Sequence, residues 1–264
     1  MNKQFKSSDD FVAIIKRGLL IDSEPIDIIR SKHGKSSFVF YATQDDKTYL
    51  FKFPRTLFQS NYLIHEERIT KELKSKFPYR IPEIEIRQDG GRLYAFYELI
   101  DGSNMSDVAL NNAETETVCL ELANILSIFS SINYKNLNVP IKSKVEVVRD
   151  FCTDFSYTPD FDSIQDIIDN DIQLIHGDFH RSNILLNSEK KVCGLLDFAT
   201  VSLGSLYFDL GHMCFSMNEK FNKYFLMACE NKLKVHIDRK KIKRMCAFFD
   251  DMINKHYVPF IKGE

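Results

Sequence analysis

The spacing of hydrophobic residues near the start of the chain predicts one short helix followed by strands. Residues 8–20 place apolar side chains at helical intervals. Residues 38–42 and 48–53 are instead short runs rich in Phe, Tyr and Leu, which favour strands, and the polar residues 44–47 between them predict a hairpin turn. We therefore expect residues 25–55 to form mainly β-structure.

A second helix and a second hairpin are expected next. Residues 61–77 have helical spacing, and two prolines follow that would end the element. Residues 84–86 and 92–97 are typical of strands and flank the sequence Asp89-Gly90-Gly91, which is a strong turn signal. This part of the chain is therefore expected to build a small lobe rich in β-structure.

Beyond residue 104 the pattern becomes mainly helical. Helical spacing recurs in the stretches 114–131, 143–157, 161–170 and 205–264. Two short apolar runs, 184–186 and 194–196, predict strands within this part. The pattern predicts an α+β protein with two lobes. We expect a β-rich N-terminal lobe at residues 1–97, a hinge at 98–103 and a larger, mainly helical C-terminal lobe at 104–264.

The segment from His176 to Phe198 contains the most specific chemical pattern in the chain. Asp178 and Asn183 lie five positions apart, and Asp197 stands at the end of the second apolar run. Phosphoryl transfer from a nucleotide requires a carboxylate beside the acceptor hydroxyl, together with an amide oxygen and a second carboxylate that hold Mg²⁺. We therefore assign Asp178 as the catalytic residue and Asn183 and Asp197 as Mg²⁺ ligands.

The N-terminal lobe offers a matching group for the phosphates of the nucleotide. Lys52 lies on a predicted strand and Glu66 on the next predicted helix. A lysine that is held by a helix carboxylate is the group that kinases use to bind the α- and β-phosphates. Glu67 is the competing partner, but the spacing to Ile69 and Leu73, which should face the interior of the lobe, favours Glu66.

Two further nucleotide contacts are expected on positional grounds. The polar loop at residues 31–37 contains Gly34, whose backbone would cover the phosphates. A G-x-G-x-x-G pattern is absent, so a plain turn is an equal alternative for this loop. In the hinge, the carbonyl of Glu98 and the amide of Ile100 are expected to meet the purine.

Three other polar residues are expected to support the 176–183 loop rather than to react. His176 and His180 lack a third soft ligand at zinc spacing in the sequence, so hydrogen bonds that brace the loop are the simpler interpretation. Asp209 stands near the start of a predicted helix and is expected to accept backbone N–H bonds near the loop.

These residues give the chain its resemblance to a known family. It resembles the aminoglycoside phosphotransferase and choline kinase superfamily, which has a protein-kinase-like fold. The resemblance covers residues 25–215 and rests on His176-Gly177-Asp178, Asn183-Ile184-Leu185, Leu196-Asp197-Phe198 and Asp209-Leu210. The Phe51-Lys52-Phe53-Pro54-Arg55 strand, the later Glu66 and Ile81-Pro82-Glu83 are similar to bacterial aminoglycoside 2″-phosphotransferases in particular, although that branch often carries a divergent catalytic loop.

The resemblance implies a kinase that transfers the γ-phosphate of ATP or GTP, with Mg²⁺, to a hydroxyl of a small cationic molecule, foremost an aminoglycoside-type antibiotic. The charge distribution agrees with a cationic acceptor. The whole chain has a net charge of −2, yet residues 101–170 hold 4 basic and 12 acidic residues. A solvated acidic helix face is the alternative explanation for this excess.

Other functions stay open at this point. Choline, another amino-alcohol, a sugar or a macrolide would keep the same chemistry, and the 22 Phe and 11 Tyr offer aromatic walls for a quaternary ammonium. A catalytically inactive nucleotide-binding module is a further alternative, against which the presence of all four candidate polar groups counts. A protein kinase is disfavoured, because the 11 residues between Asp197 and Asp209 leave no room for a long activation loop.

Composition adds expectations about partners and compartment. The 6 cysteines include no C-x-x-C pair, which indicates free thiols and a cytoplasmic protein. The nearly balanced charge and the lack of a long apolar run argue against nucleic acid and membrane partners. We expect a monomer or a weak dimer.

Overall fold

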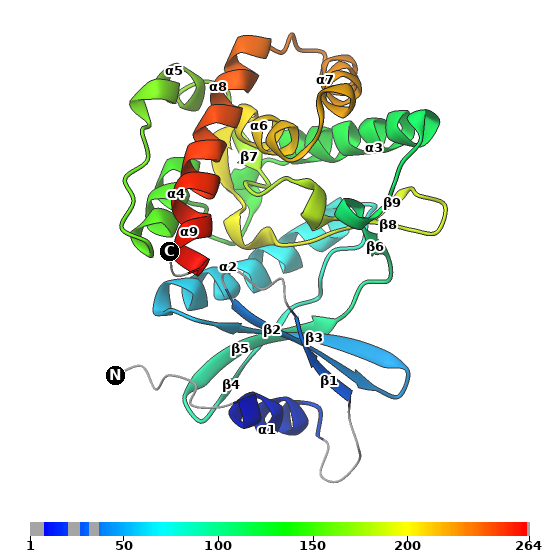
Figure 1. Cartoon of the computed structure of the whole chain (residues 1–264), viewed down its shortest axis with the longest axis vertical. Coiled ribbons are helices and arrows are strands. Elements are labelled where there is room, and N and C mark those ends of the chain that lie inside the picture. Colours follow the sequence, from blue (N-terminus) through cyan, green and yellow to red (C-terminus); the bar gives the residue numbers. More distant parts are fainter. Residues whose placement is uncertain (1–7, 21–26, 32–36, 263–264) are drawn as a thin grey trace. The chain divides into compact units, whose positions relative to one another are not determined.

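The computed structural model describes residues 8–20, 27–31 and 37–262 of the chain (Figure 1). The chain divides into two compact units. The first unit comprises Met1–Glu67 and Pro82–Leu99, and the second comprises Arg68–Ile81 and Ile100–Glu264. Gly34 lies outside the described residues.

The first unit is built on an antiparallel sheet with the strand order β1-β2-β3-β5-β4. Its elements are α1 (Ser8–Gly18), β1 (Asp27–Arg30), β2 (Ser37–Gln44), β3 (Lys47–Pro54), the first part of α2 (Leu57–Leu73), β4 (Glu85–Asp89) and β5 (Arg92–Glu98). Both predicted hairpin turns are present, with positive φ at Asp45, Asp46, Gly90 and Gly91. Two consecutive residues with positive φ are the signature of the type I′ turn, whose twist matches that of the flanking strands.

Helix α1 lies against this sheet (Figure 1), and aromatic side chains fill the contact between them. The ring of Phe11 lies 4.9 Å from that of Phe40 and 5.0 Å from that of Phe53. Phe51 and Phe53 alternate with Lys52 on β3 and are fully buried. Successive side chains of a strand point to opposite faces, so Lys52 lies on the other face of the sheet from this aromatic core.

The second unit combines helices with two small antiparallel sheets. Its helices are α3 (Asn112–Ser131), α4 (Lys144–Thr153), α5 (Gln165–Ile168), α6 (Tyr207–Ser216), α7 (Glu219–Leu233), α8 (Arg239–Phe249) and α9 (Val258–Lys262), with a π-helical stretch at Asp250–Tyr257. Its strands are β6 (Ser103–Asn104), β7 (Ile172–Ile175), β8 (Ile184–Leu186), β9 (Val192–Leu195) and β10 (Ser202–Ser205). One sheet has the order β6-β8-β9, and β10 pairs with β7 in the other.

Local sequence explains where the central helices begin. Asn111 and Glu114 form a capping box at the start of α3, and Ser143 and Glu146 form another at the start of α4. Each box satisfies backbone N–H groups that have no partner within the helix. The second box fixes the first residue of α4, Lys144, beside the loop described below.

The core of the second unit forms around α3 and α7, which lie side by side (Figure 1). Leu122 and Phe129 from α3 and Phe225 from α7 are almost completely buried. Ile69 and Leu73, at the end of α2, join this core. Residues 68–81 therefore belong to the second unit, whereas the predicted N-terminal lobe included them.

The observed elements follow most of the predicted ones. The predicted α+β mixture is present, and the helix predicted at 61–77 begins earlier and ends as a short 3-10 turn at Lys74–Lys76. The helix predicted at 161–170 is shorter and split. The pairing of β7 with β10 was not predicted. Within the described part of the chain, every helix is too short or too polar to cross a membrane.

Candidate active site

Residues 176–183, which we call the catalytic loop, connect β7 to β8 in the second unit. β7 pairs with β10, and β8 pairs with β6 and β9, so both ends of the loop are held in sheets. The loop ends in a 3-10 turn at Arg181–Asn183. Asp178 and Asn183 are thus presented from a short segment whose two ends are fixed.

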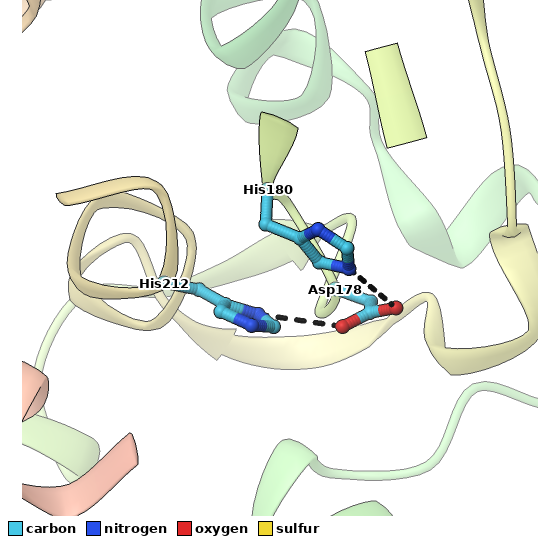
Figure 2. A group of neighbouring side chains, drawn as sticks. All are labelled: Asp178, His180 and His212. Carbon is cyan, nitrogen blue, oxygen red and sulfur yellow. Dashed lines mark ion pairs between the residues drawn. The ribbon is translucent and has the colours of Figure 1, made fainter. Parts of the chain in front are cut away.

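Asp178 is held in place from several sides (Figure 2). Asn183 Nδ2 donates to the backbone O of Asp178 at 2.9 Å and to its Oδ2 at 3.0 Å. His180 Nε2 lies 3.5 Å from Oδ2, and His212 Nδ1, from α6, lies 3.3 Å from Oδ1. Burial alone would raise the pKa of the Asp178 carboxyl, but the surrounding imidazoles, foremost that of His180, lower it well below its usual range. The carboxylate is therefore ionised at neutral pH.

Asn183 and Asp197 are brought together by the ends of β8 and β9. The Leu196 N–H donates to the Asn183 carbonyl at 2.9 Å, so Asp197 follows directly after the residue that is paired with Asn183. Asp197 has φ of +64°, a left-handed backbone that few non-glycine residues adopt. Because Nδ2 of Asn183 bonds to Asp178, its Oδ1 is the atom that can bind a cation. Amide and carboxylate oxygens are the ligands that Mg²⁺ prefers, so this pair fits the predicted ion.

His176 braces the catalytic loop from inside, as the sequence predicted. It is completely buried, and its Nε2 bonds to the carbonyl of Leu196 at 3.0 Å. Its Nδ1 accepts the N–H of Asp178 at 3.2 Å, which places the ring proton on Nε2. Burial lowers the pKa of His176 to about 4, so the ring is neutral at physiological pH.

Asp209 fixes the turn that precedes Asp178, also as predicted. Its carboxylate accepts the N–H groups of His176 and Gly177, both at 2.8 Å, and it is 1% exposed. Burial raises the pKa of Asp209 to about 6, against the opposing effect of these two hydrogen bonds. Gly177 has φ of +82°, and a Cβ at this position would lie 2.2 Å from the carbonyl oxygen of Thr200. Any other residue at 177 would therefore deform the turn.

Lys144 completes the support of the loop, a role that no sequence pattern indicated. Its side chain is buried at 5% exposure, and Nζ donates to the Gly177 carbonyl at 2.5 Å. Burial lowers the pKa of Lys144, whereas the carboxylates of Asp178 and Asp209 act in the opposite direction. A buried ammonium is costly unless opposite charges compensate it. Lys144 therefore holds the loop backbone and offsets the two carboxylates.

The predicted phosphate-binding pair is formed within the first unit. Lys52 Nζ lies 3.3 Å from both carboxylate oxygens of Glu66. Glu66 is completely buried, whereas the Lys52 side chain keeps 14% exposure. The spacing argument thus selected the residue that contacts Lys52. The predicted purine contacts, Glu98 and Ile100, end β5 and begin the second unit, respectively, and their role stays a prediction.

Part of the acidic excess at residues 101–170 is paired with neighbouring side chains of the second unit. Asp150 pairs with Lys142 at 2.7 Å, and Asp166 pairs with Arg244. Asp169 accepts a hydrogen bond from the side chain of Gln165 at 2.6 Å. Several of these acids therefore stabilise the surface of the second unit, which weakens the argument from charge for a cationic acceptor.

The buried histidines predict that the protein loses stability in acid. The pKa of His176 is about 4 and that of His212 about 3, both lowered by burial from 6.5, so the stability they contribute is present above pH 6.5 and lost as pH falls toward 4. The raised pKa of Asp209 acts in the opposite direction below pH 6, and Asp178 titrates below this range. Unfolding in this range therefore takes up two protons at the histidines and releases one at Asp209. The free energy of unfolding is expected to fall by about 1.4 kcal/mol per pH unit between pH 6 and pH 4, which corresponds to the net uptake of one proton.

Urea unfolding between pH 4 and pH 7 measures this slope. His212→Gln should flatten it, because one of the two histidines that must take up a proton is removed. The matched control is His236→Gln, since the side chain of His236 is 90% exposed. Stability that rises on acidification would contradict the assignment of neutral buried rings.

Comparison with known proteins adds a family and a fold. A model of the phosphotransferase enzyme family matches residues 27–230. No curated protein sequence matches the chain. The GDP and kanamycin complex of APH(2")-IIia has a TM-score of 0.70 at 16% identity, over 96% of this chain and 97% of that one.

Two further solved structures extend this result. Aminoglycoside-3'-phosphotransferase of type VIII has a TM-score of 0.71 at 15% identity, over 91% of this chain and 98% of that one. Macrolide 2'-phosphotransferase type I has a TM-score of 0.69 at 15% identity, over 100% of this chain and 95% of that one. At this level of identity these likenesses establish the fold, and they confirm the predicted fold class.

Proposed function

Because this chain belongs to the phosphotransferase enzyme family and is an enzyme with a hydroxyl acceptor, we propose that it transfers the γ-phosphate of ATP or GTP to an aminoglycoside-type antibiotic. The membership confirms the superfamily expected from the sequence. One observation carries the proposal: an ionised Asp178 whose backbone and side chain are fixed by Asn183. This is the arrangement required beside an acceptor hydroxyl.

Each polar group then has a distinct task. Asp178 orients the acceptor hydroxyl and takes its proton late, since a loose transition state demands little of a base. Asn183 and Asp197 hold Mg²⁺, which supplies charge neutralisation of the phosphates when bound. Lys52, kept in place by Glu66, binds the α- and β-phosphates. His176, Asp209 and Lys144 keep the catalytic loop in shape.

The acceptor class rests on the structural relatives. APH(2")-IIia is described in complex with kanamycin, and a second relative is an aminoglycoside 3'-phosphotransferase. The likeness to the 2″ branch, which the sequence indicated, is part of this proposal as well.

A macrolide is the second candidate acceptor, and a specific observation favours it. The second unit contains a cluster of aromatic rings, in which Phe151, Phe155 and Tyr257 have centroid separations of 4.8 to 5.5 Å. These rings are only half-buried. A surface of this kind suits an apolar macrocycle or a quaternary ammonium better than a polyamine.

An acceptor panel tests the proposal. The purified chain is incubated with Mg²⁺ and ATP or GTP, and with kanamycin, a macrolide, choline or no acceptor, and phosphorylated product is detected by mass spectrometry. We expect a mass increase of one phosphoryl group on kanamycin. Phosphorylation of the macrolide or choline alone would replace the acceptor, and no product with any acceptor would refute the proposed activity.

Lys52→Met is expected to weaken nucleotide use strongly. Removing the ammonium deletes a charge-assisted contact to the phosphates and takes away a cation that lies 3.3 Å from the buried Glu66 carboxylate. We expect kcat/KM for the nucleotide to fall by about 10²-fold, an effect of about 2.7 kcal/mol. Lys191→Met is the control, because Lys191 is an exposed lysine that pairs with Glu189 at the surface, away from the assigned nucleotide contacts. Equal kinetics for the two variants would exclude the proposed role of Lys52.

A further inference from the structure

Phosphoryl transfer uses one carboxylate on the catalytic loop, yet two imidazoles face that carboxylate (Figure 2). His180 comes from the loop itself, and His212 comes from α6. Each takes one oxygen of Asp178: His212 Nδ1 lies 3.3 Å from Oδ1, and His180 Nε2 lies 3.5 Å from Oδ2. His212 therefore joins Asp178 and His180 as a third possible ligand. The sequence spacing around His180 did not reveal it, because His212 lies on a distant helix.

The separations of these atoms suit a small divalent ion. Two ligands at about 2.0–2.1 Å from a tetrahedral Zn²⁺ are about 3.3 Å apart. The two nitrogen–oxygen distances are 3.3 and 3.5 Å, and one ligand atom from each residue lies within 4.8 Å of the others. The two rings have centroids 4.7 Å apart, so both can face one ion.

The surroundings of His212 suit it to bind a metal ion. It is 8% exposed, and its Nδ1 is a buried atom that makes no hydrogen bond in the described structure. Its ring stacks on Phe249 at 4.4 Å, which fixes its orientation.

His180 sets the strength of the site. Its Nδ1 accepts the N–H of Ser182 at 3.2 Å, which keeps the ring proton on Nε2 when no metal is bound. When a metal binds Nε2, the ring proton must move to Nδ1. Nδ1 then can no longer accept the N–H of Ser182, so that hydrogen bond is lost. The site is therefore expected to bind more weakly than a structural zinc site and to release its ion readily.

We propose that Asp178, His180 and His212 form a site for a transition-metal ion such as Zn²⁺. Its ligands differ from the Mg²⁺ ligands Asn183 and Asp197, although the two sites adjoin, since Asn183 Nδ2 lies 3.3 Å from His180 Nε2. Imidazole ligands favour Zn²⁺ over Mg²⁺, so Mg²⁺ does not compete for it. Occupation of the site takes the Asp178 carboxylate away from the acceptor. On the premise of the proposed function, Zn²⁺ therefore inhibits the enzyme reversibly.

Co²⁺ is the probe of choice because its absorption reports its ligands. The chain is titrated with Co²⁺ in excess Mg²⁺. We expect one equivalent to give visible bands of a tetrahedral or five-coordinate ion, to lack the near-ultraviolet band of a cysteine ligand and to be displaced by Zn²⁺. His212→Gln and, separately, His180→Gln should weaken binding by at least about tenfold, since even second-shell changes cost that much. His236→Gln, at an exposed position, should bind as the parent does.

The results of the Co²⁺ titration and of the activity assay distinguish a failure of this site from a failure of the proposed function. No Co²⁺ spectrum, or binding that neither variant weakens, would overturn the site. Binding without loss of phosphoryl transfer would overturn its inhibitory role. If the chain binds Co²⁺ as described but phosphorylates no acceptor, the site stands and the proposed function fails. Inhibition by Zn²⁺ that a chelator reverses, and that His212→Gln reduces, supports both.

Discussion

Asp178→Asn is expected to lower turnover by about 10³-fold or more while the protein still binds its nucleotide. The amide cannot take the proton of the acceptor hydroxyl, and it withdraws the negative charge that orients that hydroxyl. The nucleotide phosphates are assigned to other residues, Lys52 and the ligands of Mg²⁺. The effect should therefore fall on kcat, with little change in the dissociation constant of the nucleotide.

Steady-state kinetics with the best acceptor, together with nucleotide binding by calorimetry, measure the two quantities separately. Asp162→Asn is the matched control, because Asp162 is an exposed acid of the same unit. Folding is checked by circular dichroism. Turnover within tenfold of the parent enzyme would exclude Asp178 as the catalytic residue.

Asp209→Ala is expected to cost about 3–5 kcal/mol of the free energy of unfolding. The change leaves the N–H groups of His176 and Gly177 buried without their acceptor, and it removes one of the two carboxylates that compensate Lys144. Urea unfolding at pH 7 measures the loss. Asp166→Ala is the control, since the exposed pair of Asp166 with Arg244 should contribute little to the free energy of unfolding.

A double-mutant cycle shows whether Lys144 and Asp209 act as a unit. Lys144→Met alone should also destabilise the protein, because the buried Asp209 and the partly exposed Asp178 then lose their nearby cation. The double variant should cost less than the sum of the single changes, since neither residue leaves the other's charge uncompensated. Strict additivity would mean that the two side chains act independently, and the support of the loop by a shared charge arrangement would be wrong.

Much of the fold followed from local patterns. Asp45-Asp46 and Gly90-Gly91 predicted the two hairpins because few residue pairs adopt consecutive positive φ angles. The helical spacing of residues 114–131 located α3 to within two residues. Lys52 and Glu66 were found because strand and helix periodicity fix which side chains share a face.

Contacts between distant segments account for what was missed. β7 and β10 pair across a separation of about 30 residues, and no local pattern encodes such a pairing. Lys144 follows a helix-capping serine, where a lysine is normally exposed, so nothing in the sequence indicated its burial. His212 did leave a signal: it stands three residues after Asp209, which puts both on one face of α6 and toward the catalytic loop.

The left-handed backbone of Asp197 has a consequence for protein engineering. A non-glycine residue pays about 1 kcal/mol to adopt this conformation, and glycine does not. Asp197→Gly is therefore expected to fold with the same turn and yet to be inactive, which circular dichroism and an acceptor assay together reveal. A screen of this chain for folded protein alone would not select against glycine at position 197, so a screen that also demands turnover is needed to keep the aspartate.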